Sequence, residues 1–174
     1  MSEKQAFWST NWVEINIDVE ALDKVVKSKT TVVDMIEKLG PEFVTHTKKV
    51  YINLIFTTPT PKVTAGKLTS NTTIDITSTT AFRHIRAVVA KVQTLASIKT
   101  LEVILRVPKW SAAPVTMQQL QYVLPFYPLD FTNWEVKWMN GNMSIPRELP
   151  AFAMENLNKE WIKIDDELEP WRKK

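Results

Sequence analysis

The chain has 174 residues, of which 44% are hydrophobic and 24% charged, and it contains no cysteine. A chain of this length can bury about two-thirds of its unfolded surface in one core, so we expect a single globular domain, and the missing thiols exclude disulfides, thiolate metal sites and a cysteine nucleophile. The net charge is only +3, but ten basic and two acidic residues lie between Thr47 and Trp110, so this segment is cationic while both flanking parts are acidic.

The amino-terminal sequence and the hydropathy pattern predict the cellular location of the protein. No apolar run of signal-peptide length follows Met1, and no stretch approaches the roughly 20 apolar residues that span a bilayer. We therefore expect an intracellular protein, cytoplasmic or nuclear, without a signal peptide, a transmembrane segment or contact with a membrane. The single domain covers residues 1–174, and mobility is expected only at its ends, residues 1–10 and 170–174.

Two short helices are predicted before the cationic segment. The first covers residues 18–28, because apolar residues recur at helical spacing behind Asp18, whose side chain can cap the exposed amides. The second covers residues 31–39 and ends at Gly40-Pro41, since glycine and proline together stop a helix.

Two strands separated by a polar loop are predicted next. Residues 49–58 form the first, because apolar and polar side chains alternate along them, and Pro59 and Pro61 follow its end. Its apolar face carries Val50, Ile52, Leu54 and Phe56. A second strand is expected at residues 72–77, so the two strands can pair as a hairpin with a long loop.

The clearest helix is predicted over residues 81–97, whose apolar side chains form one stripe while Arg83 and Arg86 lie outside it. A strand with one buried face is expected at residues 101–107, where leucines and valines alternate with charged residues. Pro108 ends it, because proline cannot donate to a sheet ladder.

Three further elements complete the predicted secondary structure. Thr116 and Gln119 have the spacing of a capping box, so a helix begins there and ends at Pro125. Residues 133–139 form a strand, because apolar and charged side chains alternate along them and leave only one face apolar. Residues 150–170 form a helix, because their apolar residues recur at intervals of three and four.

Each predicted strand has one polar, solvent-exposed face and one apolar, buried face, unlike the strands of a parallel sheet that helices cover on both sides. We therefore predict an α+β fold: a two-layer sandwich with a mixed four-stranded sheet, helices mainly on one face, and flanking terminal helices. Its strands lie near residues 50, 74, 103 and 136, and the helices near residues 88 and 120 connect them. The sequence does not determine the strand order.

The cationic segment, residues 47–110, indicates a possible anion-binding surface. The candidate contacts to nucleic acid or a phosphorylated ligand are Lys48, Lys49, Arg83, Arg86, Lys91, Arg106 and Lys109. Lysine and arginine neutralise phosphates, and aromatics such as Tyr51 and Trp110 can stack on bases. No RNP, KH, zinc-finger or helix-turn-helix pattern accompanies the charge, and basic residues that only decorate a helix face and strand ends also explain it.

Aromatic residues suggest a protein interface instead. The chain has seven tryptophans, and aromatic side chains are over-represented among the residues that dominate binding energy at interfaces. The interface candidates are Trp8, Trp12, Trp110, Phe126, Tyr127 and Trp171. The same side chains can also pack within the chain, and only those exposed together imply a partner.

Catalysis has little support in the sequence. His46 and His84 are the only histidines, and the sequence identifies no nucleophile, acid or metal ligand beside either. The three glycines lie far apart in the sequence, so it contains neither a glycine-rich dinucleotide-binding motif nor a phosphate-binding P-loop. We assign no catalytic residue, no metal site and no cofactor.

The sequence thus predicts a non-enzymatic module that binds another protein, or a second copy of itself, through an aromatic surface. Binding of nucleic acid or a phosphorylated ligand through the basic segment is the alternative. An enzyme of unrecognised type is the third possibility.

Overall fold

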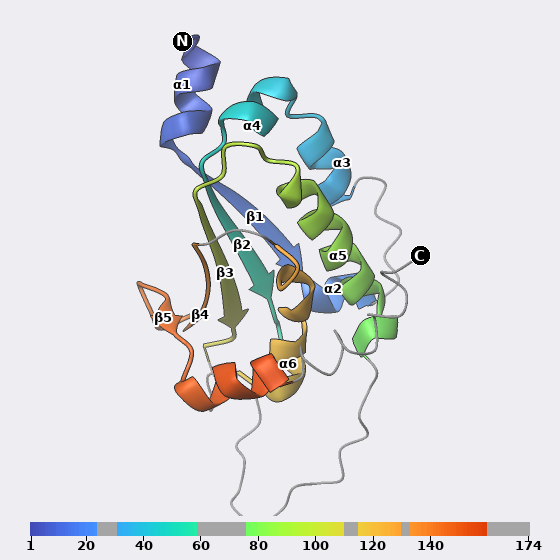
Figure 1. Cartoon of the computed structure of the whole chain (residues 1–174). Coiled ribbons are helices and arrows are strands. Elements are labelled where there is room, and N and C mark those ends of the chain that lie inside the picture. The colour runs from blue at the N-terminus through green and yellow to red at the C-terminus, as the bar shows by residue number, and fades with distance from the viewer. Residues whose placement is uncertain (24–30, 59–75, 110–114, 130–132, 160–174) are drawn as a thin grey trace, which may run out of the picture.

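A five-stranded sheet forms the centre of the molecule (Figure 1). The computed structural model describes residues 1–23, 31–58, 76–109, 115–129 and 133–159. The strands, which lie in the sheet in chain order, are β1 (Trp12–Asp18), β2 (Lys49–Ile55), β3 (Thr100–Val107), β4 (Trp134–Asn140) and β5 (Arg147–Glu148). The first four are parallel to one another, and β5 pairs antiparallel with β4. The sheet is therefore mixed, as predicted.

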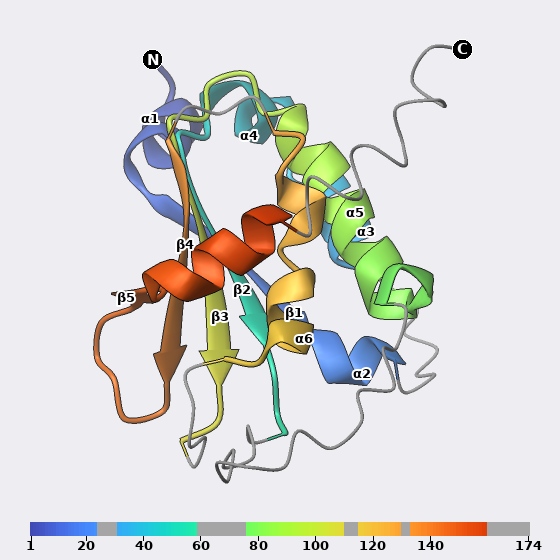
Figure 2. The same ribbon diagram turned by 60° about the horizontal axis from the view of Figure 1, so that its bottom comes forward.

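The helices lie before β1 and in the connections between the parallel strands. They are α1 (Glu3–Thr10), α2 (Val19–Asp23), α3 (Val32–Glu37), α4 (Pro41–His46), α5 (Thr80–Gln93) and α6 (Met117–Gln121), with 3₁₀ turns η1 (Ile76–Ser78) and η2 (Leu124–Phe126). Another helix begins at Ala151 and is described to Lys159. Each connection from β1 to β4 moves the chain one strand in the same direction, and such crossovers have one hand, so their helices gather on one face of the sheet (Figures 1 and 2). The helix α1 lies apart from them, beyond the amino-terminal ends of the strands, where it contacts α4.

The apolar face of the sheet packs against these helices to form the core. The register aligns Ile15, Ile52, Val103 and Val136 across the four parallel strands, and all four are buried. Helix α5 contributes the largest apolar stripe to the same core. Its buried residues are Ala81, Phe82, Ile85, Val88, Val89 and Val92. Because the side chains of a strand alternate, the opposite face of the same strands carries their polar residues.

The α+β fold is confirmed, but the predicted number of strands was too low. No element was predicted for residues 12–17, which together with Asp18 form β1, and β5 was also missed. Most of the strand predicted at residues 72–77 lies outside the described residues, and its last two residues, Ile76 and Thr77, belong to a 3₁₀ turn instead. The sheet therefore has β1 as one of its two edge strands, which the sequence analysis did not expect.

The predicted helices differ from the observed ones mainly at their ends. In the region predicted as helix 18–28, α2 covers residues 19–23 and the rest lies outside the described residues. Gly40, with φ of 84°, ends the α3 region and directly precedes α4, which was not predicted and begins at Pro41. The predicted capping box is confirmed, because the Gln119 amide donates to the Thr116 hydroxyl and the Thr116 amide donates to the Gln119 side chain.

Two terminal regions also bear on the sequence predictions. Residues 3–10 form α1, which a capping box between Ser2 and Gln5 stabilises, whereas residues 170–174 lie outside the described residues. The helix predicted at residues 150–170 is seen as far as Lys159, with Ala153 and Leu157 buried. Within the described part of the chain, no helix has the length and apolar character needed to cross a membrane.

One histidine in the helical layer makes stability depend on pH. The Nε2 atom of His84, on α5, is buried and no described group bonds to it. Burial lowers the pKa of His84 below its ordinary value of 6.5, and this effect outweighs the opposing field of Asp34 on α3. The folded state therefore disfavours the protonated imidazole.

We expect the free energy of unfolding to fall as the pH drops below about 6.5, because the unfolded chain then binds a proton at His84 that the folded chain resists. The substitution His84→Gln removes the imidazole that binds this proton, so the free energy of unfolding of the variant should depend less on pH between about 6.5 and 5. Urea unfolding of both proteins over a pH series measures the difference. Parallel profiles would show that His84 titrates alike in the folded and unfolded states.

Candidate functional site

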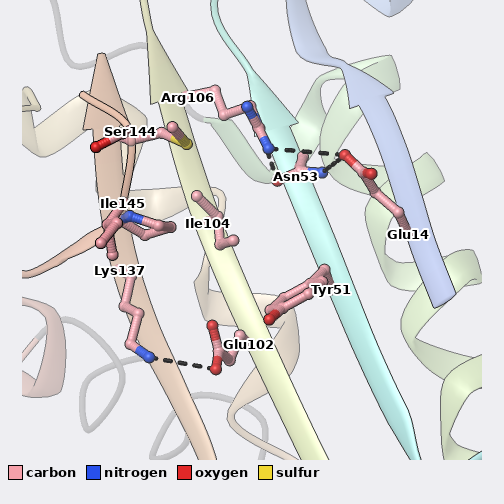
Figure 3. A pocket seen from close by; sticks show the side chains of 11 residues that line it. Glu14, Tyr51, Asn53, Glu102, Ile104, Arg106, Lys137, Ser144 and Ile145 are labelled. Carbon is pink, nitrogen blue, oxygen red and sulfur yellow. Dashed lines mark hydrogen bonds and ion pairs between the residues drawn. The ribbon is translucent and has the colours of Figure 1, made fainter. Parts of the chain in front are cut away.

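A hollow lies on the polar face of the sheet, opposite the side that α5 covers (Figure 3). Its volume is about 410 Å³. Side chains from all four parallel strands line it, together with residues 144–146 from the turn between β4 and β5. Parallel sheets are normally covered by helices on both faces, so a solvent-accessible hollow on one face is an unusual feature.

Asn53 is the centre of a polar network on one side of the hollow. Its side chain is fully buried, and its Nδ2 atom donates to Glu14 Oε1 at 2.7 Å and to Asn16 Oδ1 at 2.8 Å. Its Oδ1 atom accepts a hydrogen bond of 2.8 Å from Arg106 Nε. One amide thus connects β1, β2 and β3. It also holds the Arg106 guanidinium over the sheet, where Nη2 lies 3.6 Å from Glu14 Oε1.

Lys137 forms a second charged cluster on the other side of the hollow. Its Nζ atom lies 3.2 Å from Glu102 Oε1 and 2.9 Å from Glu135 Oε1. Burial alone would lower the pKa of Lys137, but the hydrogen bonds and charges of the two glutamates outweigh it and raise the pKa. The ammonium group therefore stays charged at neutral pH.

Tyr51 lies between the two clusters (Figure 3). Burial and then the charge of Glu102 raise the pKa of its hydroxyl above the ordinary value of 10.0. Its ring stacks on Trp12 of β1, with centroids 3.7 Å apart and planes inclined by 10°. Lys49 Nζ lies 5.7 Å from the centre of the Trp12 ring, close enough for a cation–π contact. The Trp12–Tyr51 pair and Lys49 thus extend the polar face towards the amino-terminal ends of β1 and β2.

The turn between β4 and β5 forms an apolar wall of the hollow. Ile145, on this turn, is 73% exposed although it is a large hydrophobic residue. The turn is fixed to the end of β3 because Asn142 Nδ2 donates to the Lys109 carbonyl at 3.3 Å. A Cβ atom at Gly141 would lie only 3.1 Å from Lys109 Cβ, so glycine allows this close approach. The wall is therefore held in place by local structure.

Neither Tyr51 nor Lys137 is suited to act as a general base in the hollow. Because the pKa values of Tyr51 and Lys137 are raised, both groups stay protonated near neutral pH, whereas a general base must lose its proton to act. The two histidines lie on α4 and α5 and do not line the hollow. Within the described ranges, no group of three or more potential ligands of the kinds His, Cys, Asp and Glu is arranged to hold a metal ion.

The structure distributes the predicted cationic residues over different surfaces. Arg83 and Arg86 are exposed on α5, in the helical layer, and Lys91 of the same helix forms an ion pair with Glu37. Lys49 and Arg106 lie on the opposite, polar face of the sheet. Lys48 directly precedes β2, and Lys109 lies beyond the other end of β3. The seven residues therefore do not form one patch, and nucleic-acid binding stays a prediction from the sequence alone.

The predicted interface aromatics also separate into groups. Phe126 is fully buried in the core, and Trp8 packs edge-on against Phe43 with ring centroids 5.1 Å apart. Tyr127 is half-buried, and its hydroxyl donates to Asn158 Oδ1 at 2.6 Å. Burial raises its pKa to about 12. Trp12 is 37% exposed on the polar face. The remaining two candidates, Trp110 and Trp171, lie outside the described residues.

The residues that form the hollow were mostly missed by the sequence analysis, which singled out Arg106 only for its charge and Tyr51 only as an aromatic that can stack on bases. Asn53 and Lys137 each occupy the polar side of an alternating strand, where a polar residue is expected in any case. One signal in the sequence could have found them. Each predicted strand carries hydrogen-bonding or charged side chains on its solvent-facing side, so these residues share one face of the sheet. Only the strand order shows that these groups meet.

Comparisons with protein families, with curated proteins and with solved structures found no match for this chain.

Proposed function

We propose that the chain is a non-enzymatic interaction module that binds another protein through the hollowed polar face of its sheet. The observation that carries this proposal is the combination of a hollow lined by both signs of charge with hydrophobic groups at its margin. Trp12 and Ile145 keep substantial exposure although burial would stabilise them, and tryptophan is the side chain most enriched at interface hot spots.

The polar groups of the hollow suit recognition of a folded or extended protein surface. Arg106 and Lys137 are held by neighbouring side chains, so little conformational entropy is lost when a partner contacts them. Glu14 and Glu102 provide acceptors a few residues away on the same face. A partner that places an apolar residue against Ile145 and charged residues of both signs around it would complement the surface.

The proposal is tested with a phage-displayed peptide library selected on the immobilised protein. Selected peptides are then titrated against the isotopically labelled chain and followed by amide NMR shifts. We expect the shifted amides to lie on β1 to β4 around the hollow. Shifts confined to the outer surface of α5 would contradict the proposed surface and favour the Arg83 and Arg86 region.

Replacing Trp12 by alanine should weaken binding of such a peptide at least tenfold, since truncation of an aromatic anchor at a hot spot costs about 2 kcal/mol or more. The fold should survive, because Trp12 is partly exposed and its main described ring contact is the stack on Tyr51. The matched control is Phe152→Ala, which removes an aromatic residue that is 64% exposed outside the hollow. Equal affinity of the two variants would contradict a role for Trp12 in the contact surface.

A further inference from the structure

The outer edge of β1 has the chemistry of a pairing surface. β1 is the first strand of the sheet, and within the described part of the chain only β2 pairs with it. About half of the backbone N–H and C=O groups in such a strand point away from its single neighbour and are available to another strand. Because β1 has seven residues, this edge is long enough to hold a full additional strand.

β1 lacks the usual features that prevent edge-to-edge pairing. Native sheets protect their edges with proline, with lysine, with bulges or with charges that point inward. The sequence of β1, Trp-Val-Glu-Ile-Asn-Ile-Asp, contains no proline and no lysine, and its register with β2 runs without a bulge over all seven residues. Its charged residues, Glu14 and Asp18, are exposed on the polar face, whereas the inward residues Ile15 and Ile17 are apolar.

The charges of β1 are arranged to accept a second copy of the same strand. In an antiparallel pair centred on Ile15, all seven residues pair, Val13 faces Ile17 of the second copy, and Glu14 faces Asn16 of the second copy. A shift by two residues in one direction places Glu14 opposite itself, and a shift in the other direction places Glu14 opposite Asp18. A shift by one residue sets polar side chains against apolar ones. The full-length register therefore avoids both the like-charge pairs and the mixing of polar and apolar faces that these shifts produce.

We infer that two copies of this chain associate through antiparallel pairing of their β1 strands in the register centred on Ile15. The contact uses the same surface of both copies, as a two-fold dimer requires. A two-fold axis perpendicular to the sheet places both helical layers on one side and both hollowed faces on the other. The inference goes beyond the proposed function, because peptide binding to the hollow requires no dimer.

The test measures dimerisation of the full chain by sedimentation equilibrium at low salt, for wild type and two variants of Asn16. This residue is exposed and faces Glu14 of the second copy in the inferred register. Asn16→Glu creates a like-charge contact twice in the dimer and should raise the dissociation constant about tenfold. Asn16→Lys creates two opposite-charge contacts and should lower it severalfold. Both changes should shrink at high salt, because solvent-exposed charges are screened.

Matched controls keep the result specific to β1. Gln93→Glu and Gln93→Lys make the same charge changes at an exposed position on α5 and should leave the dissociation constant unchanged. Thermal unfolding checks that all variants fold. A wild-type chain that stays monomeric at every concentration overturns the inference, as does a dimer that both Asn16 variants leave unchanged or weaken alike. Peptide binding by the wild-type chain at concentrations below the dissociation constant of the dimer tests the proposed function separately.

Discussion

Replacing Phe126 by alanine is expected to lower the free energy of unfolding by about 3–5 kcal/mol, the usual cost of removing a large buried aromatic side chain. Phe126 ends the 3₁₀ turn η2, which contacts α5, and its ring centroid lies 6.4 Å from that of Trp134 on β4. It is fully buried. Removing it leaves a cavity between the helical layer and β4, because the surrounding side chains relax only in part.

Urea unfolding of the wild type and of Phe126→Ala measures this loss. The control is Tyr127→Phe, at the next position, which keeps the ring and removes only the hydroxyl that donates to Asn158. A half-buried hydrogen bond of this kind contributes about 1 kcal/mol, so the control should stay close to the wild type. If Phe126→Ala were as stable as the wild type but bound partners less well, Phe126 would belong to an interface and its burial in the core would be contradicted.

The same residue shows why some sequence predictions succeeded and others did not. The segment around Phe126 is rich in aromatics and prolines, and composition alone does not distinguish a surface anchor from a core residue. In contrast, the alternation along β2 and the apolar stripe of α5 predicted buried faces correctly, because burial in those elements follows directly from the periods of the strand and the helix. Local periodicity is thus informative where an element is regular, and it says little about an irregular connection.

The missed strand β1 is a different case. Val13, Ile15 and Ile17 alternate with Glu14 and Asn16, so the strand signal was present in the sequence. What the sequence does not contain is the order of strands in the sheet. A one-sided pattern is typical of an antiparallel sheet, yet β1 to β4 are parallel, with the polar face left accessible at the hollow. This arrangement depends on contacts between distant segments, and it brings together the residues of the candidate site.

Replacing Asn53 by alanine is expected to lower the free energy of unfolding by about 2–3 kcal/mol, because three hydrogen bonds of a fully buried side chain are lost and each contributes about 1 kcal/mol. The bonds go to Glu14, Asn16 and Arg106, which lie 39, 37 and 53 residues away in the sequence. The partners are at least partly exposed, so water can replace some of what they lose. That replacement keeps the expected cost below that of an orphaned buried charge.

The position of Arg106 provides the second part of this prediction. Without the Asn53 carbonyl, the guanidinium keeps only Glu14 among its described partners, so it should lose its fixed orientation over the hollow. A double-mutant cycle of Asn53→Ala with Arg106→Ala, followed by urea unfolding, should therefore give a coupling energy of about 1 kcal/mol, as contacting residues in one network usually do. The control cycle pairs Asn53→Ala with Lys137→Ala, which belongs to the separate cluster of Glu102 and Glu135. Equal coupling in both cycles would mean that Asn53 stabilises the sheet as a whole. Coupling confined to Arg106 would mean that this buried amide specifically fixes the orientation of the Arg106 guanidinium on the polar face.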